Sequence, residues 1–352
     1  MKKTFFLLII ILLVPLYFPE AKGCRYTIRE IGYTPLRLQT YILEMEVDTL
    51  AHRSLIERFR KIATEMESTT NIRYRVRHAP GSPPELYLLN TKGNTLLKAP
   101  ALTEGEIRSF YREVLFSPLQ RTFCEQIGNV FAFLVCFYDE QDTASDRALE
   151  EALARFARLA PTLDKPADLQ IMKIVVPSVD REKEGVVLRA AGIDPYDPAP
   201  VVMVVYGRGR LAGPPLQDGE ITRDNLLRQL VMLGTDCECG IDLSPLLQRA
   251  LPLQWTAAMS QKVADMLGFD VENPMVLNEM SQILAKEPTP TVDEVLTFAP
   301  RSVDLDKVFG KKNPPSPPKA SSATLRTTLA AIAITLLVVL AGIIFLIVRK
   351  RK

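Results

Sequence analysis

A six-residue motif occurs twice in this chain of 352 residues. Leu102–Ile107 reads Leu-Thr-Glu-Gly-Glu-Ile, and Leu216–Ile221, 114 positions later, reads Leu-Gln-Asp-Gly-Glu-Ile. Before each copy, an apolar run, a glycine-containing turn and a second short apolar run form the pattern of a β-hairpin. An amphipathic helix pattern follows each copy. A repeat with the same order of elements predicts two tandem domains of similar fold.

The residues before the second hairpin supply the rest of a domain. Apolar runs predict strands at 130–138 and 169–176, and helical spacing of apolar residues predicts helices at 144–159 and 182–191. Residues 200–211 then form the hairpin, and the amphipathic helix follows it. The expected order is therefore strand, helix, strand, helix, hairpin, helix, written βαβαββα.

The first copy is a compressed version of the same order. We expect a strand at 36–47, a helix at 50–66 and a strand at 72–77. A short loop with several prolines then leads directly into the hairpin. Both copies therefore predict an α/β fold.

This order, with a proline directly before the third strand, resembles the thioredoxin-like superfamily. The resemblance implies two tandem domains, at 24–127 and 128–240. It places Pro200, and more weakly Pro84, where the superfamily has a cis-proline. The reactive Cys-x-x-Cys of the superfamily lies after the first strand, where this chain has Tyr138–Asp142 in the second copy. No Cys-x-x-Cys occurs in the sequence, so the copies are degenerate and lack the superfamily's redox motif.

The N-terminus has the order of a secretory signal, with two lysines before an apolar run at 5–14 and small residues at Ala21 and Gly23. We expect a signal peptide at 1–23. Cleavage there leaves Cys24 as the first mature residue. Cys24 is therefore a lipidation candidate, and the alternative is an ordinary structural cysteine.

The C-terminus predicts a membrane anchor. Residues 329–348 carry no charge and span about 30 Å as a helix, which is the thickness of one hydrocarbon core. We expect a transmembrane helix at 326–348 and a basic cytoplasmic tail at 349–352, because basic residues stay inside. The bulk of the chain is then extracytoplasmic. Seven prolines between 288 and 318 indicate an extended linker at 288–325.

A helical juxtamembrane segment is expected at 241–287, with helices at 244–250, 254–267 and 275–284. Their apolar stripes fit packing on the second domain, and a membrane partner is the alternative. Between the two basic ends, the chain has about five more acidic than basic residues. That balance argues against nucleic-acid binding, which needs a concentrated basic face.

The five cysteines leave three readings open. Cys124, Cys237 and Cys239 end equivalent helices and are disulfide candidates for an exported protein. Buried free thiols are the second reading, and a redox pair of Cys237 and Cys239 is the third. Cys136 lies within an apolar strand and is expected to be buried. With only two histidines, the chain has little material for a Ser-His-Asp centre or a histidine-rich zinc site.

Two loops of the second copy meet where thioredoxin-like proteins carry their chemistry. We call their residues the acidic corner: Tyr138, Asp139, Glu140, Asp142, Asp194, Tyr196, Asp197 and Pro200. These carboxylates could bind a divalent cation or a basic segment of a partner. Alternatively, they act only as helix caps and turn formers. Arg208 and Arg210, on the second hairpin turn, read as solvating charges or partner contacts.

Together these features predict a membrane-anchored, extracytoplasmic binding or scaffold protein of a bacterial cell envelope. Its expected partner is another envelope or membrane protein, as in an accessory subunit of a membrane complex. We assign no catalytic residue, no metal ligand and no cofactor. A thiol–disulfide oxidoreductase using Cys237 and Cys239 is the rival function, and a divalent-cation-binding module is the third.

Overall fold

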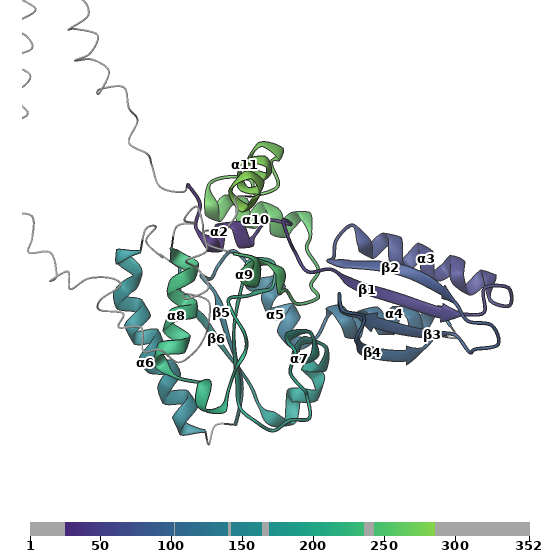
Figure 1. Ribbon diagram of the computed structural model, residues 1–352, viewed down its shortest axis with the longest axis horizontal. Coiled ribbons are helices and arrows are strands. Elements are labelled where there is room, and N and C mark those ends of the chain that lie inside the picture. The colour runs from purple at the N-terminus through teal and green to yellow at the C-terminus, as the bar shows by residue number, and fades with distance from the viewer. Residues whose placement is uncertain (1–24, 102, 140–141, 164–168, 236–242, 286–352) are drawn as a thin grey trace, which may run out of the picture. The chain divides into compact units, whose positions relative to one another are not determined.

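The computed structural model describes residues 25–101, 103–139, 142–163, 169–235 and 243–285 (Figure 1). The predicted signal peptide, the lipidation candidate Cys24, the proline-rich linker and the predicted transmembrane helix lie outside these residues. Within the described ranges, no helix combines the length and apolarity needed to cross a membrane. The signal peptide, the lipidation, the linker and the membrane anchor therefore stay predictions.

The first copy of the repeat forms a four-stranded mixed sheet in the order β2-β1-β3-β4. Its strands are β1 (Tyr41–Val47), β2 (Ile72–His78), β3 (Glu85–Leu89) and β4 (Thr95–Pro100). β1 and β2 are parallel and joined by helix α3 (Arg53–Glu67), whereas β3 is antiparallel to both β1 and β4. Helix α4 (Glu104–Leu115) follows the hairpin.

One face of the first sheet packs on helices and the other does not. Tyr41, Leu43 and Met45 alternate along β1 and are buried with side chains of α3 and α4, such as Phe59 and Phe110. Because successive side chains of a strand point to opposite faces, the residues between them face away from these helices. The first sheet is therefore a two-layer unit.

The second copy forms a second mixed sheet, with main order β6-β5-β7-β8 and β9 paired to β7. The strands are β5 (Phe133–Phe137), β6 (Met172–Val176), β7 (Val201–Tyr206), β8 (Arg210–Leu211) and β9 (Leu216–Gln217). Its helices are α6 (Thr143–Leu159), the short 3₁₀ helix η3 (Ser178–Glu184) continuing into α7 (Gly185–Ala191), and α8 (Arg223–Gly234). β5 is parallel to β6 and antiparallel to β7.

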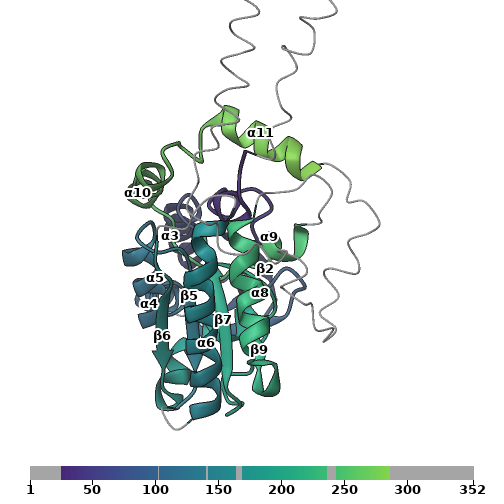
Figure 2. The ribbon, with the colours of Figure 1, turned by 90° about the vertical axis from the view of Figure 1, so that its left-hand side faces the viewer.

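Helices cover both faces of the second sheet. α6 and α8 lie side by side in front of the strands in Figure 2. The other face buries Phe133, Val135 and Phe137 against α5 (Pro118–Gln126), α7 and α10 (Ala257–Leu267). All five residues of β5 and all six of β7 are consequently buried.

Segments from both sides of the repeat pack on the second sheet. Helix α2 (Ile28–Gly32) precedes the first sheet in sequence, yet the N–H of Ile28 donates to the carbonyl of Thr235 (3.2 Å). Tyr33 and Phe123, both within the predicted first domain, lie in the core of the second sheet. Helices α9 (Ser244–Gln248) and α11 (Pro274–Ala285) complete the described chain. The two sheets therefore share their packing across the repeat boundary.

The mixed α/β fold with two sheets is confirmed, and two details of it were wrong. We expected the helix after the first hairpin to run on toward Cys124, but α4 ends at Leu115 and α5 begins at Pro118. Ser117 caps α5 and proline occupies its first turn, the position where a missing N–H costs nothing. The cis-proline expected at Pro200 or Pro84 is absent, because every peptide bond in the described ranges is trans. A trans bond is the lower-energy form by about 0.5–1 kcal/mol.

Candidate functional site

The first loop of the acidic corner uses its carboxylates to hold backbone. Asp139 accepts from the N–H of Ser178 (3.0 Å), which holds the pKa of that carboxyl below its usual range. Asp142 caps α6 by accepting from the N–H of Ser145 (3.1 Å). Tyr138 donates its hydroxyl to Asp146 on α6 (3.0 Å). Glu140 lies outside the described residues.

The second loop of the acidic corner also uses its carboxylates to bind backbone N–H groups. Asp194 accepts from the N–H of Tyr196 (3.0 Å), and Asp197 accepts from the N–H of Ala199 (2.9 Å), so both form local turns before Pro200. Tyr196 is 69% exposed. Nowhere in the described ranges do three or more His, Cys, Asp or Glu side chains gather in a way that could hold a metal ion. The described carboxylates of the acidic corner therefore act as caps and turn formers.

Of the two described thiols, that of Cys136 is buried and that of Cys124 is partly buried. Cys136 lies inside β5, and burial raises its pKa to about 12. Cys124 on α5 is a free, partly buried thiol whose pKa burial raises to about 11. A disulfide of Cys124 with Cys237 or Cys239 stays a prediction. Cys237 and Cys239 lie outside the described residues.

Two buried charged side chains of η3 lie behind the corner. Arg181 donates from Nη1 to the carbonyl of Ala199 (2.8 Å), and Glu184 accepts from the N–H of Leu119 at the start of α5 (2.9 Å). The remaining polar atoms of both side chains are buried without a hydrogen-bond partner in the described structure. Burial consequently raises the pKa of Glu184 and lowers that of Arg181.

Two irregular segments join the sheets. The linker segment, residues 33–40, runs from α2 to β1, and the return segment, residues 249–255, runs from α9 towards α10. The return segment bridges β8 through Arg210 and Ala250, and it bridges the residues before β2 through Thr70 and Gln254. Asn71 donates to the carbonyls of Gln39 (3.1 Å) and Leu251 (2.9 Å) and so ties the two segments together.

Arg210 is the fully buried centre of this junction. Its guanidinium donates to the carbonyls of Gly32 (2.9 Å), Thr34 (2.7 Å), Leu36 (2.7 Å) and Leu247. None of these partners is a carboxylate, and burial lowers the pKa of the guanidinium to about 10. A rigid fork with five N–H donors can satisfy several carbonyls at once, which a lysine ammonium cannot match in geometry.

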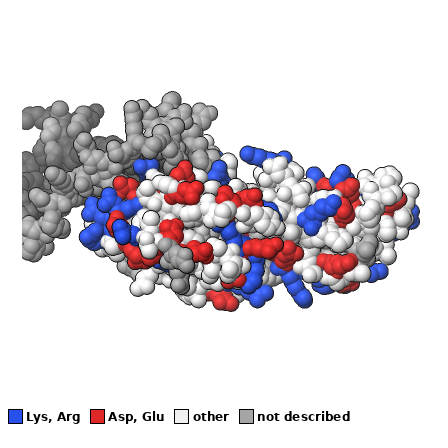
Figure 3. All heavy atoms as spheres, turned by 90° about the horizontal axis from the view of Figure 1, so that it is seen from below, with Lys and Arg blue, Asp and Glu red and all other residues white. Residues whose placement is uncertain are grey.

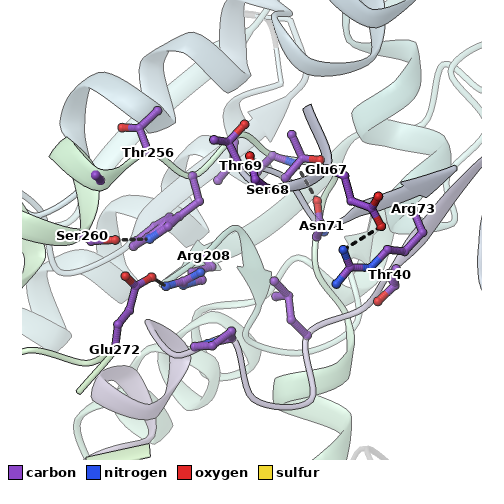
Figure 4. A pocket seen from close by; sticks show the side chains of 16 residues that line it. Thr40, Glu67, Ser68, Thr69, Asn71, Arg73, Arg208, Thr256, Ser260 and Glu272 are labelled. Carbon is purple, nitrogen blue, oxygen red and sulfur yellow. Dashed lines mark hydrogen bonds and ion pairs between the residues drawn. The ribbon is translucent and has the colours of Figure 1, made fainter. Parts of the chain in front are cut away.

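A pocket of about 570 Å³ opens between the linker segment and the return segment; we call it the seam pocket (Figure 4). Its lining includes these residues: Pro35, Leu38, Thr40, Glu67, Ser68, Thr69, Thr70, Asn71, Arg73, Arg208, Leu253, Trp255, Thr256, Ala257, Ser260 and Glu272. The volume lies within the ~300–1,000 Å³ usual for small-molecule sites. Hydroxyl groups and one amide dominate the polar lining.

Two ion pairs face the seam pocket from opposite sides (Figure 4). Arg208 pairs with Glu272 on one side, and Arg73 pairs with Glu67 (2.9 Å) on the other. Arg208 lies over the ring of Trp255, with 4.3 Å between the guanidinium carbon and the ring centroid. These four charges cancel, so the lining is neutral as a whole.

The wider surface shows the same balance. Figure 3 shows basic and acidic side chains intermixed over the described part of the face that it draws, without a broad area of one sign. A concentrated basic face is the footprint of nucleic-acid binding. The described part of the visible face does not have it.

No protein-family model matches the sequence, and none of the curated proteins matches it. Among solved structures, the zinc-bound form of human ERp44 is similar over 60% of this chain and 60% of its own, with 11% identity and a TM-score of 0.21. The first two thioredoxin domains of Saccharomyces cerevisiae Eps1p match 60% of this chain and 97% of theirs, with 11% identity and a TM-score of 0.20. Those of Naumovozyma dairenensis Eps1p match 54% and 88%, with 15% identity and a TM-score of 0.18.

Both sheets have the arrangement on which the resemblance rests. In each, a helix joins two parallel strands, and an antiparallel hairpin and a helix follow, with the first strand of the copy in the interior of the sheet. The fold is mixed α/β with two sheets, in the element order that suggested the resemblance. The chemistry of the superfamily does not follow from it, since the sequence has no Cys-x-x-Cys.

The sequence analysis did not identify the residues around the seam pocket as a site. We expected Arg208 and Arg210 to be exposed on a hairpin turn, yet both are buried. The signal that could have found them is the glycine on either side of Arg208. Gly207 has φ +54°, and a Cβ there would collide with the backbone of Gly32. Alternating glycine and arginine therefore marked a close backbone approach rather than a solvated turn.

Proposed function

We propose that this protein is a redox-inert, thioredoxin-like binding protein, held at a cell membrane by its C-terminal apolar segment with its folded part outside the cytoplasm. The observation that carries the binding role is the seam pocket. It is a preformed, neutral, hydroxyl-lined cavity with an aromatic residue and two ion pairs at its walls. Such convergence of polar groups in a concave site is the usual form of a binding site.

The state of the acidic corner supports a role without redox chemistry. Its described carboxylates are engaged by backbone N–H groups, and the described thiols have pKa values raised by burial. A thiol with a pKa of about 11 is ionised in only about one molecule in a thousand at pH 8. The thiolate is the reactive form, so neither described cysteine suits thiol exchange.

The ends of the sequence support the proposed location. A signal-like N-terminus, a charge-free stretch of twenty residues and a basic tail favour a single span with a cytoplasmic C-terminus. In that setting the partner we propose is another envelope or membrane protein, served by this chain as an accessory subunit.

The binding role can be tested by photo-crosslinking of the full-length protein in native membranes. A photoreactive amino acid at Thr256 lines the seam pocket, and one at the exposed Lys92 serves as the matched control in a hairpin turn. We expect one defined adduct from Thr256 and none from Lys92. Equal labelling from both positions, or no adduct from Thr256, would refute the seam pocket as the binding site.

The redox rival is tested on the same preparation. The full-length protein is expected to show no reduction of insulin by dithiothreitol above the uncatalysed rate. Activity that disappears in the double variant Cys237→Ser, Cys239→Ser would instead establish the oxidoreductase. Activity that persists in that variant would point to Cys24, Cys124 or Cys136, against the buried character of the last two.

A further inference from the structure

We infer that the seam pocket binds a carboxylate group, which takes the place of Glu272 on Arg208; this inference rests on the proposed binding role of the pocket. Arg208 is 8% exposed and lines the cavity. A buried guanidinium needs a hydrogen-bonding anion or equivalent acceptors, because removing it from water is costly. The question is therefore which anion serves it.

Arg208 is held in place without the help of Glu272. Its Nε donates to the carbonyl of Tyr33 in the linker segment (2.7 Å), and its guanidinium carbon lies over the indole of Trp255, 4.3 Å from the ring centroid. The N–H of Arg208 also donates to the carbonyl of Gly32 (3.1 Å). The cation is thus fixed by backbone and by an aromatic ring.

Glu272, in contrast, is held loosely. It lies in the turn between α10 and α11, where its N–H donates to Asp270 (2.8 Å), and its side chain is 42% exposed. It contacts Arg208 through Nη2, while Nη1 makes no hydrogen bond within the described residues. A half-exposed carboxylate bonded to one nitrogen can be displaced by a ligand that engages the planar fork with two oxygens.

The charge balance favours exchange over addition. With Glu67 and Glu272 paired, the four charges of the lining sum to zero, and one more carboxylate would leave an excess negative charge in the pocket. Departure of Glu272 into water restores neutrality. A phosphate would bring a second negative charge towards Glu67, so the lining favours a carboxylate over a phosphate.

The rest of the lining suits a polar body attached to that carboxylate. Thr40, Ser68 and Thr256 offer hydroxyls, and Leu38 and Leu253 provide an apolar wall. This is the chemistry of a peptide end: a carboxylate, amide groups and a partly apolar chain. A free small carboxylic acid shares the carboxylate but fills less of the cavity.

The single tryptophan of the chain, Trp255, gives a direct reporter of the pocket. The full-length protein in detergent is titrated at constant ionic strength with N-acetyl-tetraalanine, with its C-terminal amide, and with acetate. Indole fluorescence is recorded throughout. We expect a saturable change with the acid and none with the amide. A response to acetate as strong as that to the peptide assigns the site to free small acids.

Three charge-neutralising variants complete the test. Glu272→Gln removes the internal competitor and is expected to tighten binding of the acid about tenfold, which corresponds to about 1.4 kcal/mol. Glu67→Gln, the matched control in the other ion pair, is expected to change affinity less than threefold, as for a surface pair. Arg208→Gln is expected to abolish binding; should that variant fail to fold, the Glu272 and Glu67 comparison still decides.

Equal responses to the acid and the amide would overturn the inference, as would an unchanged affinity in Glu272→Gln. A Thr256 crosslink to a partner in membranes, combined with either of those results, would leave the binding role standing while refuting the carboxylate. Absence of the Thr256 crosslink, together with either of those results, would refute the seam pocket as a binding site.

Discussion

The central strands β1 and β5 differ in sequence pattern, and the difference reflects how many faces of each sheet are covered by helices. β1 reads Tyr-Ile-Leu-Glu-Met-Glu-Val, and its two glutamates face away from α3 and α4. β5 reads Phe-Leu-Val-Cys-Phe and is buried at every position. A strand with one covered face alternates, whereas a strand with two covered faces does not.

The first sheet lacks a second helical layer because its connection between β2 and β3 is short. In the second sheet, η3 and α7 lie between β6 and β7 and help to cover the Val135 face. In the first sheet, only residues 79–84 connect β2 to β3. Too few residues remain for a helix, so the equivalent face carries charge. Glu44 there is nearly buried and pairs with Arg75 and Arg77.

This contrast teaches that one fold tolerates either an apolar or a charged face, provided that the covering layer changes with it. The contrast can be tested first where the two sheets are joined.

The largest effect is expected at Arg210, which ties the linker segment and α9 to the second sheet. Arg210→Met removes a donor from four backbone carbonyls, of which that of Gly32 keeps the backbone N–H of Arg208, and we expect a loss of about 5 kcal/mol or more in unfolding free energy. Arg249→Met, at an exposed position in the facing return segment, is the control and should cost less than about 0.5 kcal/mol. Urea denaturation measures both. Similar losses in the two variants would contradict the central role of Arg210.

Exchanging the character of the two faces comes next. Val135→Glu buries an unpaired carboxylate under the layer that the first sheet lacks, and should cost about 4 kcal/mol. Glu44→Val removes a carboxylate whose arginine partners are half exposed, and should cost about 1 kcal/mol. Thermal and urea unfolding of both variants test the asymmetry. Equal costs would show that the two faces do not differ as described.

A pH-dependent effect is expected at Glu184, in the connection that only the second sheet has. Burial raises its pKa, so its contribution to stability is complete below the ordinary glutamate value and is lost as pH rises through the raised pKa. Glu184→Gln should therefore raise the denaturation midpoint at pH 8 and leave it nearly unchanged at pH 4. Glu182→Gln, two residues away at an exposed position, is the control. A gain for Glu184→Gln that does not depend on pH would contradict this account.

The smallest effect is expected at the rim of the charged face. Glu46→Gln removes the partner of Arg77 at a solvent-facing position, and should cost about 0.5 kcal/mol or less, decreasing further with added salt. The measurement is urea denaturation at low and high ionic strength. A salt-independent loss above about 1 kcal/mol would show that this pair is structural rather than a surface ion pair.

Much of the fold could be predicted from the sequence, because hydrophobic periodicity reflects which faces of strands and helices are covered by other elements. The strands and helices of both copies, and the helices α9, α10 and α11, appear within a few residues of their predicted places. Helix α2 was not predicted, because five residues are too few to establish a helical period. Its capping box, Thr27 with Glu30, was the only local signal.

The candidate site was much less predictable, and the reason is physical. The acidic corner was expected from fold resemblance. Phe137 and Val201, next to its two loops, pair in the sheet, and Asp139 and Asp197 accept hydrogen bonds from backbone N–H groups. The seam pocket depends on contacts between residues far apart in sequence, such as Asn71 with Leu251 and Arg208 with Tyr33. No local pattern encodes such pairs. The burial of an arginine that donates to backbone carbonyls likewise produces no periodic pattern in the sequence.

The meeting of the first and last described helices has a mechanical consequence. Tyr26 donates its hydroxyl to Glu279 on α11 (2.8 Å), and Arg37 donates to the carbonyl of Leu284. A pull applied between residues 25 and 285 therefore loads the contacts that join these segments, both hydrogen bonds and the ring contact of Tyr26 with Phe269 among them. The first sheet, inserted in the chain between α2 and the return segment, stays outside the initial line of force. Tension would part the two ends before it loaded a single strand of that sheet.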